Sequence, residues 1–147
     1  MKSLNTEAYK KFIEEVELKR ITNVLGRYRR TGDFSESKTK TELTVETARA
    51  SFDPPYIHSE NNLAIPVGYR IEVKLEDDLL AEFEYHYEVV FVVDDNTVVE
   101  NALEDTDLVE FLTGYQMDKL IWSYLRSNLS ETCSRMGIRQ IVLPLLR

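Results

Sequence analysis

Two runs of alternating side chains between residues 69 and 93 constrain the fold most strongly. In residues 69–75 an apolar side chain occupies every second position, and charged side chains fill the positions between them. The same alternation returns from residue 81, after an acidic break at Asp77 and Asp78, until Val90 and Val92 make both faces apolar, so we expect that end of the strand to be covered on both faces. Because successive side chains of a strand point to opposite faces, the two runs predict a long antiparallel hairpin. One of its faces is exposed to solvent (the wet face), and the other is buried in the core (the dry face).

One short helix and two further strands are predicted before this hairpin. Residues 5–15 (NTEAYKKFIEE) are amphipathic at helical spacing, which predicts an N-terminal helix. A β pattern in residues 16–30 and a clear alternation in residues 41–52 predict the two strands. Pro54 lacks the N–H group that a sheet ladder needs, so we predict a loop over residues 53–66.

A long C-terminal helix is predicted from residue 116 to residue 136. Its apolar side chains recur at spacings of three and four and define one stripe, formed by Leu120, Ile121, Tyr124, Leu125, Leu129, Cys133 and Met136. Trp122 lies off this stripe, and Gly137 is a natural left-handed stop for the helix. The apolar tail of residues 137–147 then needs a cover, which its own sheet, a sister subunit or a client could supply.

These elements predict an α+β fold, in which a four-stranded antiparallel sheet carries the long C-terminal helix on one face. We predict a single domain over residues 1–147. Its parts are an N-terminal helix (1–15), the sheet (16–94), a connection (95–115), the long helix (116–136) and the apolar tail (137–147).

Composition and net charge limit the classes of function that the protein can have. A chain of 147 residues, with 43% hydrophobic and 30% charged residues, suits one globular domain. The net charge of -8 argues against nucleic-acid binding. The basic stretch at residues 27–30 has no aromatic stacking platform beside it, so we predict a solvated loop or strand face that pairs with acids elsewhere.

The cellular setting is predicted from what the sequence lacks. No apolar run is long enough to span a membrane, and the N-terminus lacks the apolar core of a signal peptide. Cys133 is the only cysteine, which excludes an internal disulfide. We therefore expect a cytoplasmic protein that does not insert into membranes.

The sequence offers little that could perform catalysis. His86 lies between Glu84 and Glu88 on one predicted strand face, but a metal or acid–base site there needs a further ligand that the sequence does not indicate. Cys133 falls in the apolar stripe, where a buried thiol is inert. Neither a P-loop nor a G-x-S-x-G elbow is present. We expect a protein that is not an enzyme and that needs no metal and no cofactor.

One stretch of the long helix and the residues after it resemble a known family. The residues Trp122, Ser123, Tyr124, Leu125 and Arg126, followed by Gly137 and then Leu143 and Pro144, are similar to the motif of the SecB family of export chaperones. The resemblance implies a sheet that pairs with a sister subunit, and two such dimers that associate through their long helices into a tetramer. It also implies binding of unfolded polypeptide clients in apolar grooves and their delivery to the SecA translocation motor, without nucleotide or catalysis.

The resemblance assigns roles to particular residues. Tyr124, Arg126, Gly137 and Pro144 match the structural part of the motif. The acidic hairpin tip, a candidate docking site for the translocase, comprises Glu76, Asp77 and Asp78. The candidate contacts to clients or to a sister subunit are Phe52, Tyr56, Ile57, Trp122, Leu129, Leu143, Leu145 and Leu146. Each of these residues could instead belong to the ordinary core of the protein.

Departures from the family pattern narrow the expected function. Ser123 stands where the family has a proline, and the chain given ends at Arg147, where typical members continue into a second helix and an acidic tail. The first strand carries Arg20, Arg27 and Arg29, where export chaperones place part of their acidic docking residues. Client binding is therefore better supported than SecA docking. The client could be an exported protein or an aggregation-prone protein such as an antitoxin.

An alternative is a small-ligand-binding α+β domain with a pocket between the sheet and the helix. Tyrosines that face inward could hydrogen-bond a ligand, although they could equally be core residues. The predicted lining of this pocket is Tyr69, Phe83, Tyr85 and Tyr87.

Overall fold

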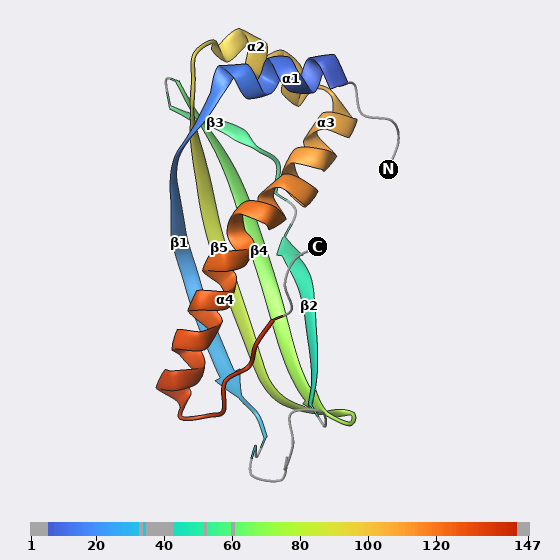
Figure 1. Ribbon diagram of the computed structural model, residues 1–147, viewed down its shortest axis with the longest axis vertical. Helices are drawn as coiled ribbons and strands as arrows, with labels where there is room; N and C mark the ends of the chain where they lie inside the picture. Colours follow the sequence, from blue (N-terminus) through green and yellow to red (C-terminus); the bar gives the residue numbers. More distant parts are fainter. Residues whose placement is uncertain (1–5, 33, 35–42, 52, 60, 144–147) are drawn as a thin grey trace. The chain divides into compact units, whose positions relative to one another are not determined.

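A computed structural model describes residues 6–32, 34, 43–51, 53–59 and 61–143 (Figure 1). Its elements, in chain order, are α1 (Thr6–Glu15), β1 (Val16–Arg30), β2 (Leu43–Ser51), β3 (Tyr56–Ser59), β4 (Asn62–Leu75), β5 (Asp78–Val93), α2 (Asn96–Leu103), α3 (Thr106–Phe111), a π-helical turn η3 (Leu112–Gln116) and α4 (Met117–Met136). No helix among these residues is long and apolar enough to cross a membrane.

The strands form one five-stranded antiparallel sheet in the order β1-β5-β4-β2, with β3 paired to β4 beside that path. The predicted α+β fold, a sheet with a long C-terminal helix, is confirmed. The fifth strand is an addition, because β3 and the start of β4 occupy part of the predicted loop. Tyr56 pairs with Ala64 and Ile57 pairs with Leu63, and Asn61 makes the turn between the strands in a left-handed conformation (φ 65°).

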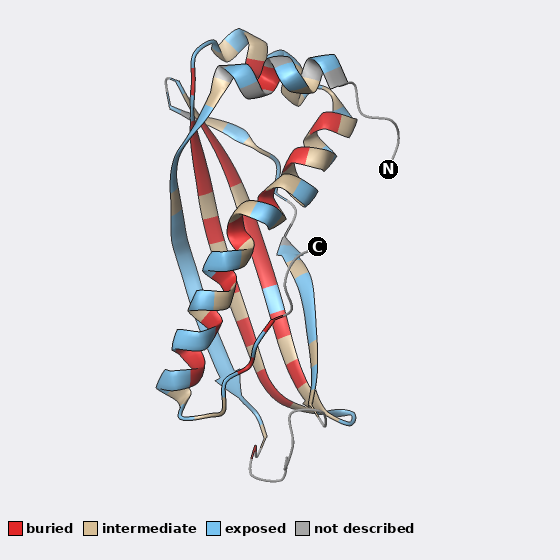
Figure 2. Ribbon diagram, in the orientation of Figure 1, coloured by how far each residue is buried: buried red, intermediate tan, exposed pale blue. Residues whose placement is uncertain are grey.

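The predicted wet and dry faces of the β4–β5 hairpin are confirmed by its burial (Figure 2). Buried and more exposed residues alternate in residues 69–74 of β4 and 81–89 of β5, and the buried set includes Ile71, Val73 and Phe83. Toward the end of β5, Val90 is also buried, whereas Val92 is exposed. β1 differs, since almost every residue from Glu17 to Arg30 is exposed. The buried face therefore lies on the central strands, and β1 is an open edge.

The chain divides into two compact units. The first comprises residues 1–24, 52–67 and 87–118. In it α1 packs against α2, α2 packs against α3, and the ring of Tyr9 meets Phe111 edge-on at 5.0 Å. Residues 95–115, predicted as a connection, contain two short helices, whose first turns are capped by the carboxylates of Asp95 and Asp105.

The second unit comprises residues 25–51, 68–86 and 119–147. Within it α4 lies on one face of the sheet (Figure 1). The residues of α4 that pack inward include Ile121, Leu125, Leu129 and Cys133, all members of the predicted stripe. Tyr124 was also assigned to that stripe, and there the prediction was wrong: its side chain is exposed, because the buried stripe advances by four residues at each step from Ile121.

A hydrogen bond inside the core ties α4 to the sheet. The hydroxyl of Tyr85 on β5 donates to Thr132 Oγ1 at 2.7 Å, and Thr132 donates in turn to the backbone carbonyl of Asn128 at 2.8 Å. Tyr85 and Thr132 are both buried. Since a buried hydroxyl without a partner is costly, this pair favours one register of the helix on the sheet.

We predict that Tyr85→Phe lowers the free energy of unfolding by about 1 kcal/mol, because it removes one buried hydrogen bond and leaves Thr132 its bond to Asn128. Urea unfolding followed by circular dichroism measures the change. Tyr124→Phe, on the exposed side of α4, is the matched control and should change stability by less than about 0.5 kcal/mol. Equal effects of the two substitutions would contradict this role of Tyr85.

Candidate functional site

The described residues after α4, which end at position 143, form an extended segment that turns back along the helix (Figure 1). Gly137 ends α4 with a left-handed φ of +70°, which confirms the predicted stop. Residues 138–143, here called the return segment, follow it. Ile141 and Leu143 are buried, whereas Val142 between them is 62% exposed. The return segment therefore covers the core with one set of side chains and presents the other to solvent.

Hydrogen bonds hold the return segment against α4. The backbone N–H of Ile138 donates to the carbonyl of Cys133 at 3.2 Å. Ser130 donates to the side-chain oxygen of Gln140 at 2.7 Å, and the amide nitrogen of Gln140 donates to Ser134 at 3.0 Å. The segment is thus anchored by its polar residues, and the apolar side chain of Val142 is left available for contact.

A hollow lies on each side of the return segment. The first has a volume of about 270 Å³ and is lined by residues 140–143 with Arg126, Ser127 and Ser130 of α4. The second has a volume of about 120 Å³ and is lined by residues 139–142 with Leu43 and Val45 of β2. The two hollows share Val142, so an apolar side chain placed in either one would contact the same exposed valine.

The predicted contact residues in the second unit differ in accessibility. Leu129 and Leu143 are buried within the single chain. Trp122 is partly exposed, and its ring meets the buried ring of Tyr69 edge-on at 6.4 Å. Arg126 lines the first hollow. The helical part of the motif therefore borders the return segment, although its roles in client binding and in assembly stay predictions.

The other predicted residues lie in different places. Tyr56 and Ile57 are on β3 in the first unit, where Tyr56 is exposed and donates to Glu88 at 3.1 Å. The acidic tip at Glu76, Asp77 and Asp78 is exposed at the turn between β4 and β5. Four predicted residues fall outside the described part of the chain: Phe52, Pro144, Leu145 and Leu146.

Sequence reasoning missed the part that Val142, Gln140 and the start of β2 play at these hollows. An alternation of inward and outward side chains in residues 141–143 was the available signal, but three residues are too few to predict a strand. The contribution of Leu43 and Val45 could not be predicted, since it depends on where the chain turns back after Gly137.

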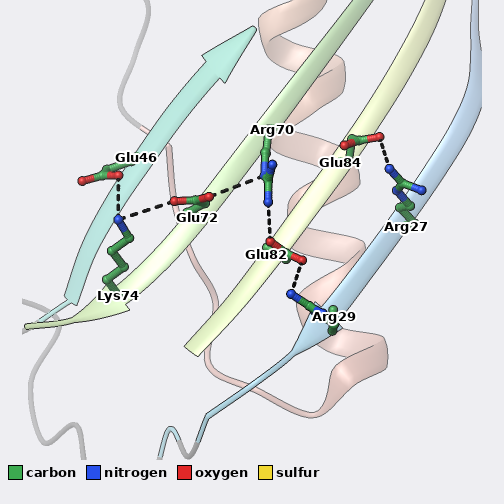
Figure 3. Close-up of polar contacts among 8 residues, drawn as sticks. All are labelled: Arg27, Arg29, Glu46, Arg70, Glu72, Lys74, Glu82 and Glu84. Atoms are coloured by element: carbon green, nitrogen blue, oxygen red, sulfur yellow. Dashed lines mark hydrogen bonds and ion pairs between the residues drawn. The ribbon is translucent and has the colours of Figure 1, made fainter. Parts of the chain in front are cut away.

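The face of the sheet opposite α4 carries a ladder of ion pairs across four strands (Figure 3). On β4, Lys74 lies 3.2 Å from Glu46 of β2 and 3.5 Å from Glu72. The charge ladder, as we call this set, comprises Glu46, Lys74, Glu72, Arg70, Glu82, Arg29, Glu84 and Arg27.

Two glutamates of β5 join the charge ladder to β1. Glu82 accepts from Arg70 and from Arg29, each at 2.8 Å, and Glu84 lies 2.7 Å from Arg27. The basic stretch therefore pairs with acids of the next strand, as the sequence predicts. A hydrogen bond from Arg70 is the main cause that lowers the pKa of Glu82. For Glu84 the main cause of a lowered pKa is the hydrogen bond with His86, 3.0 Å away, to which the charge of Arg27 adds.

The residues expected to line a pocket between sheet and helix are core residues. Tyr69, Phe83 and Tyr85 are all buried in the second unit, and Tyr87 is buried in the first. The hydroxyl of Tyr85 is bonded to Thr132 and thus engaged within the chain. These positions favour a packing role over the lining of a ligand pocket.

A comparison with solved structures finds a SecB-like chaperone from Mycobacterium tuberculosis, in complex with a ChAD peptide from an antitoxin. The likeness covers 97% of this chain and 98% of that chain, with a TM-score of 0.70 and 10% sequence identity. The fold is SecB-like. No protein-family model matches the chain, and neither does any curated protein. At this identity the SecB-like likeness concerns the fold, whereas function must be argued from the site.

The lowered pKa values of Glu82 and Glu84 predict a pH-dependent contribution to stability. Because the folded-state pKa lies below the unfolded value of about 4.3, the contribution is complete above about pH 5 and is lost as the pH falls through the folded-state pKa. Thermal unfolding of the wild type and of a Glu82→Gln, Glu84→Gln variant should show a Tm difference that shrinks from pH 7 to pH 3.5. A difference that stays constant over this range would contradict the assignment.

Proposed function

We propose that this protein is a molecular chaperone that holds non-native polypeptide and performs no catalysis. The observation that carries the proposal is the return segment, an extended stretch that exposes the apolar side chain of Val142 and has a hollow on each side. The SecB-like fold supports it, since the solved SecB-like chaperone holds a peptide.

The geometry suits a client bound without a fixed sequence. Val142 offers an apolar surface, and the hollows beside it are wide enough for the side chains of an extended chain. At the edge of the first hollow, the hydroxyl of Ser127 can donate a hydrogen bond to the client backbone or accept one from it, and Ser130, which donates to Gln140, can still accept one. Apolar contacts of this adaptable kind give affinity for many sequences.

We further propose that the protein works as a homo-oligomer, a dimer or a tetramer. The open edge strand β1 supports this, because it exposes Leu18 and Val24 in the first unit and Leu25 and Tyr28 in the second. An exposed apolar edge strand favours pairing with another strand. A sister subunit that pairs its sheet here would cover these side chains.

The client we propose is an aggregation-prone protein of the cytoplasm, such as an antitoxin. We favour such a client over a preprotein destined for SecA. The solved SecB-like chaperone is in complex with a peptide from an antitoxin, which supports this choice. The arginines at positions 20, 27 and 29 on β1 weaken the case for SecA, because the family resemblance places acidic docking residues there. The exposed acidic tip at Glu76, Asp77 and Asp78 leaves one surface where the translocase could dock.

We predict that the wild type suppresses light scattering when a chemically unfolded client is diluted out of denaturant, and that Val142→Asp weakens client binding by about tenfold or more. Losing the burial of one valine costs on the order of 1.5 kcal/mol, and burying an unpaired carboxylate adds to that cost. Val92→Asp, at an exposed valine near the end of β5, is the matched control and should retain protection.

Size exclusion with light scattering should show the same oligomer for the wild type and both variants, so that the difference reports on client binding. A wild type that leaves client aggregation unchanged would refute the chaperone proposal. Full protection by Val142→Asp would instead refute the return segment as the binding site.

A further inference from the structure

The face of the sheet opposite α4 carries a hollow of its own in the second unit. Its charged lining residues are among those drawn in Figure 3. Its volume is about 380 Å³, and it is lined by residues 27–29 of β1, Arg70 of β4 and residues 82–84 of β5. Five charged side chains thus surround one concave surface, three of them guanidinium groups and two of them carboxylates. The proposed client site does not include this hollow.

The positively charged side chains that line this hollow are more exposed than the negatively charged ones. The side chains of Arg27 and Arg29 are 67% and 66% exposed, and that of Arg70 is 49% exposed. The side chains of Glu82 and Glu84 are each only 20% exposed. A molecule that approaches this face therefore meets three guanidinium groups first, the guanidinium layer, with the carboxylates beneath them.

The carboxylates are already engaged, whereas the arginines keep donors to spare. Glu82 accepts from two arginines, one on each oxygen, and Glu84 Oε2 lies within 3.0 Å of both Arg27 and His86. Arg27 and Arg29 meet these carboxylates through Nη2. A guanidinium group has five N–H donors in a planar fork, so one such contact leaves others for a second carboxylate.

We propose that the guanidinium layer binds an acidic polypeptide segment in an extended conformation. Arg27 and Arg29 are two residues apart on one strand, so their side chains leave the same face about 6.6 Å apart. Alternate side chains of an extended peptide have the same spacing. Carboxylates at every second position of the partner would each meet one of these two arginines, and Arg70 adds a third positive charge to the lining of the hollow.

Charge also separates an acidic peptide from the other anionic ligands. The chain has a net charge of -8, so a long polyanion such as a nucleic acid would be repelled by the rest of the surface. A short peptide needs only the local field of the guanidinium layer. The site does not rest on the proposed chaperone function, because α4 and the return segment take no part in it.

The test uses fluorescence anisotropy of a labelled ten-residue peptide of alternating Glu and Thr, with the alternating Gln and Thr peptide as the uncharged control. The acidic peptide should bind the wild type and the control peptide should not. Binding should weaken as salt is added. The Arg27→Gln, Arg29→Gln double variant should weaken binding by about tenfold or more, since it removes two charge-assisted contacts.

Two further variants separate binding from folding. Arg135→Gln is the matched control: Arg135 is also 67% exposed and pairs with a glutamate, Glu131 on α4, so its loss should leave binding unchanged. Glu84→Gln removes the carboxylate that competes for Arg27 and should strengthen binding. A loss of binding in Glu84→Gln would show that the double variant acts by disturbing the sheet, and would overturn the proposal.

Three other results would also overturn it. The first is unchanged peptide binding by a folded double variant, with folding checked by circular dichroism. The second is equal binding of a single-stranded oligothymidylate of matched charge, since the surface would then respond to charge alone. The third is self-association of the wild type that disappears in the double variant, while neither protein binds the peptide. The partner of this face would then be a second copy of the chain.

Discussion

The pairing of β4 with β5 is the constraint on which the rest of the structure depends. These two strands run for 14 and 16 residues, and buried and more exposed side chains alternate in residues 69–74 and 81–89, so a single hairpin creates a dry face and a wet face. In the second unit, the dry face receives α4 through the packing of Ile121, Leu125 and Leu129 and through the bond from Tyr85 to Thr132. The wet face holds the charge ladder. A one-residue slip of either strand would turn its apolar side chains to solvent and its charged side chains to the core. It would therefore abolish both the packing of α4 and the charge ladder.

Both proposed surfaces follow from this separation of faces. On the α4 side, the helix ends at Gly137 and the return segment lies between α4 and β2, with Val142 exposed. On the opposite side, the arginines of β1 cover the glutamates of β5. One side thus offers apolar contacts that tolerate many sequences, whereas the other offers charged donors at a fixed spacing. The two surfaces suit different ligands and can be disabled separately.

The hairpin and the long helix could be predicted from the sequence because each is specified locally, by alternation in residues 69–93 and by the spacing of Leu125, Leu129 and Cys133. The four-residue strand β3 could not be predicted, since its order comes from pairing with β4 rather than from its own pattern. Tyr124 was misplaced because spacings of three and four both suit a helix stripe, and only the packing against the sheet selects one of them.

The candidate site was predicted less completely than the fold. Gly137 and the apolar residues after it predicted a candidate contact segment at the C-terminal end, where the structure places the two hollows. Which of them stay exposed is a tertiary property: Leu143 is buried and Val142 is not. The partners of Arg27 and Arg29 were predicted only as acids elsewhere, because the register of β1 against β5 is not encoded in either strand alone.

The most direct test of the central claim is hydrogen–deuterium exchange of the protein with and without a bound unfolded client. If the return segment is the client site, the amides of residues 139–143 and of the start of β2 should exchange more slowly in the complex. The amides of residues 27–29 on β1 should exchange at the same rate with and without the client. Slower exchange confined to other elements, with the return segment unchanged, would contradict the account.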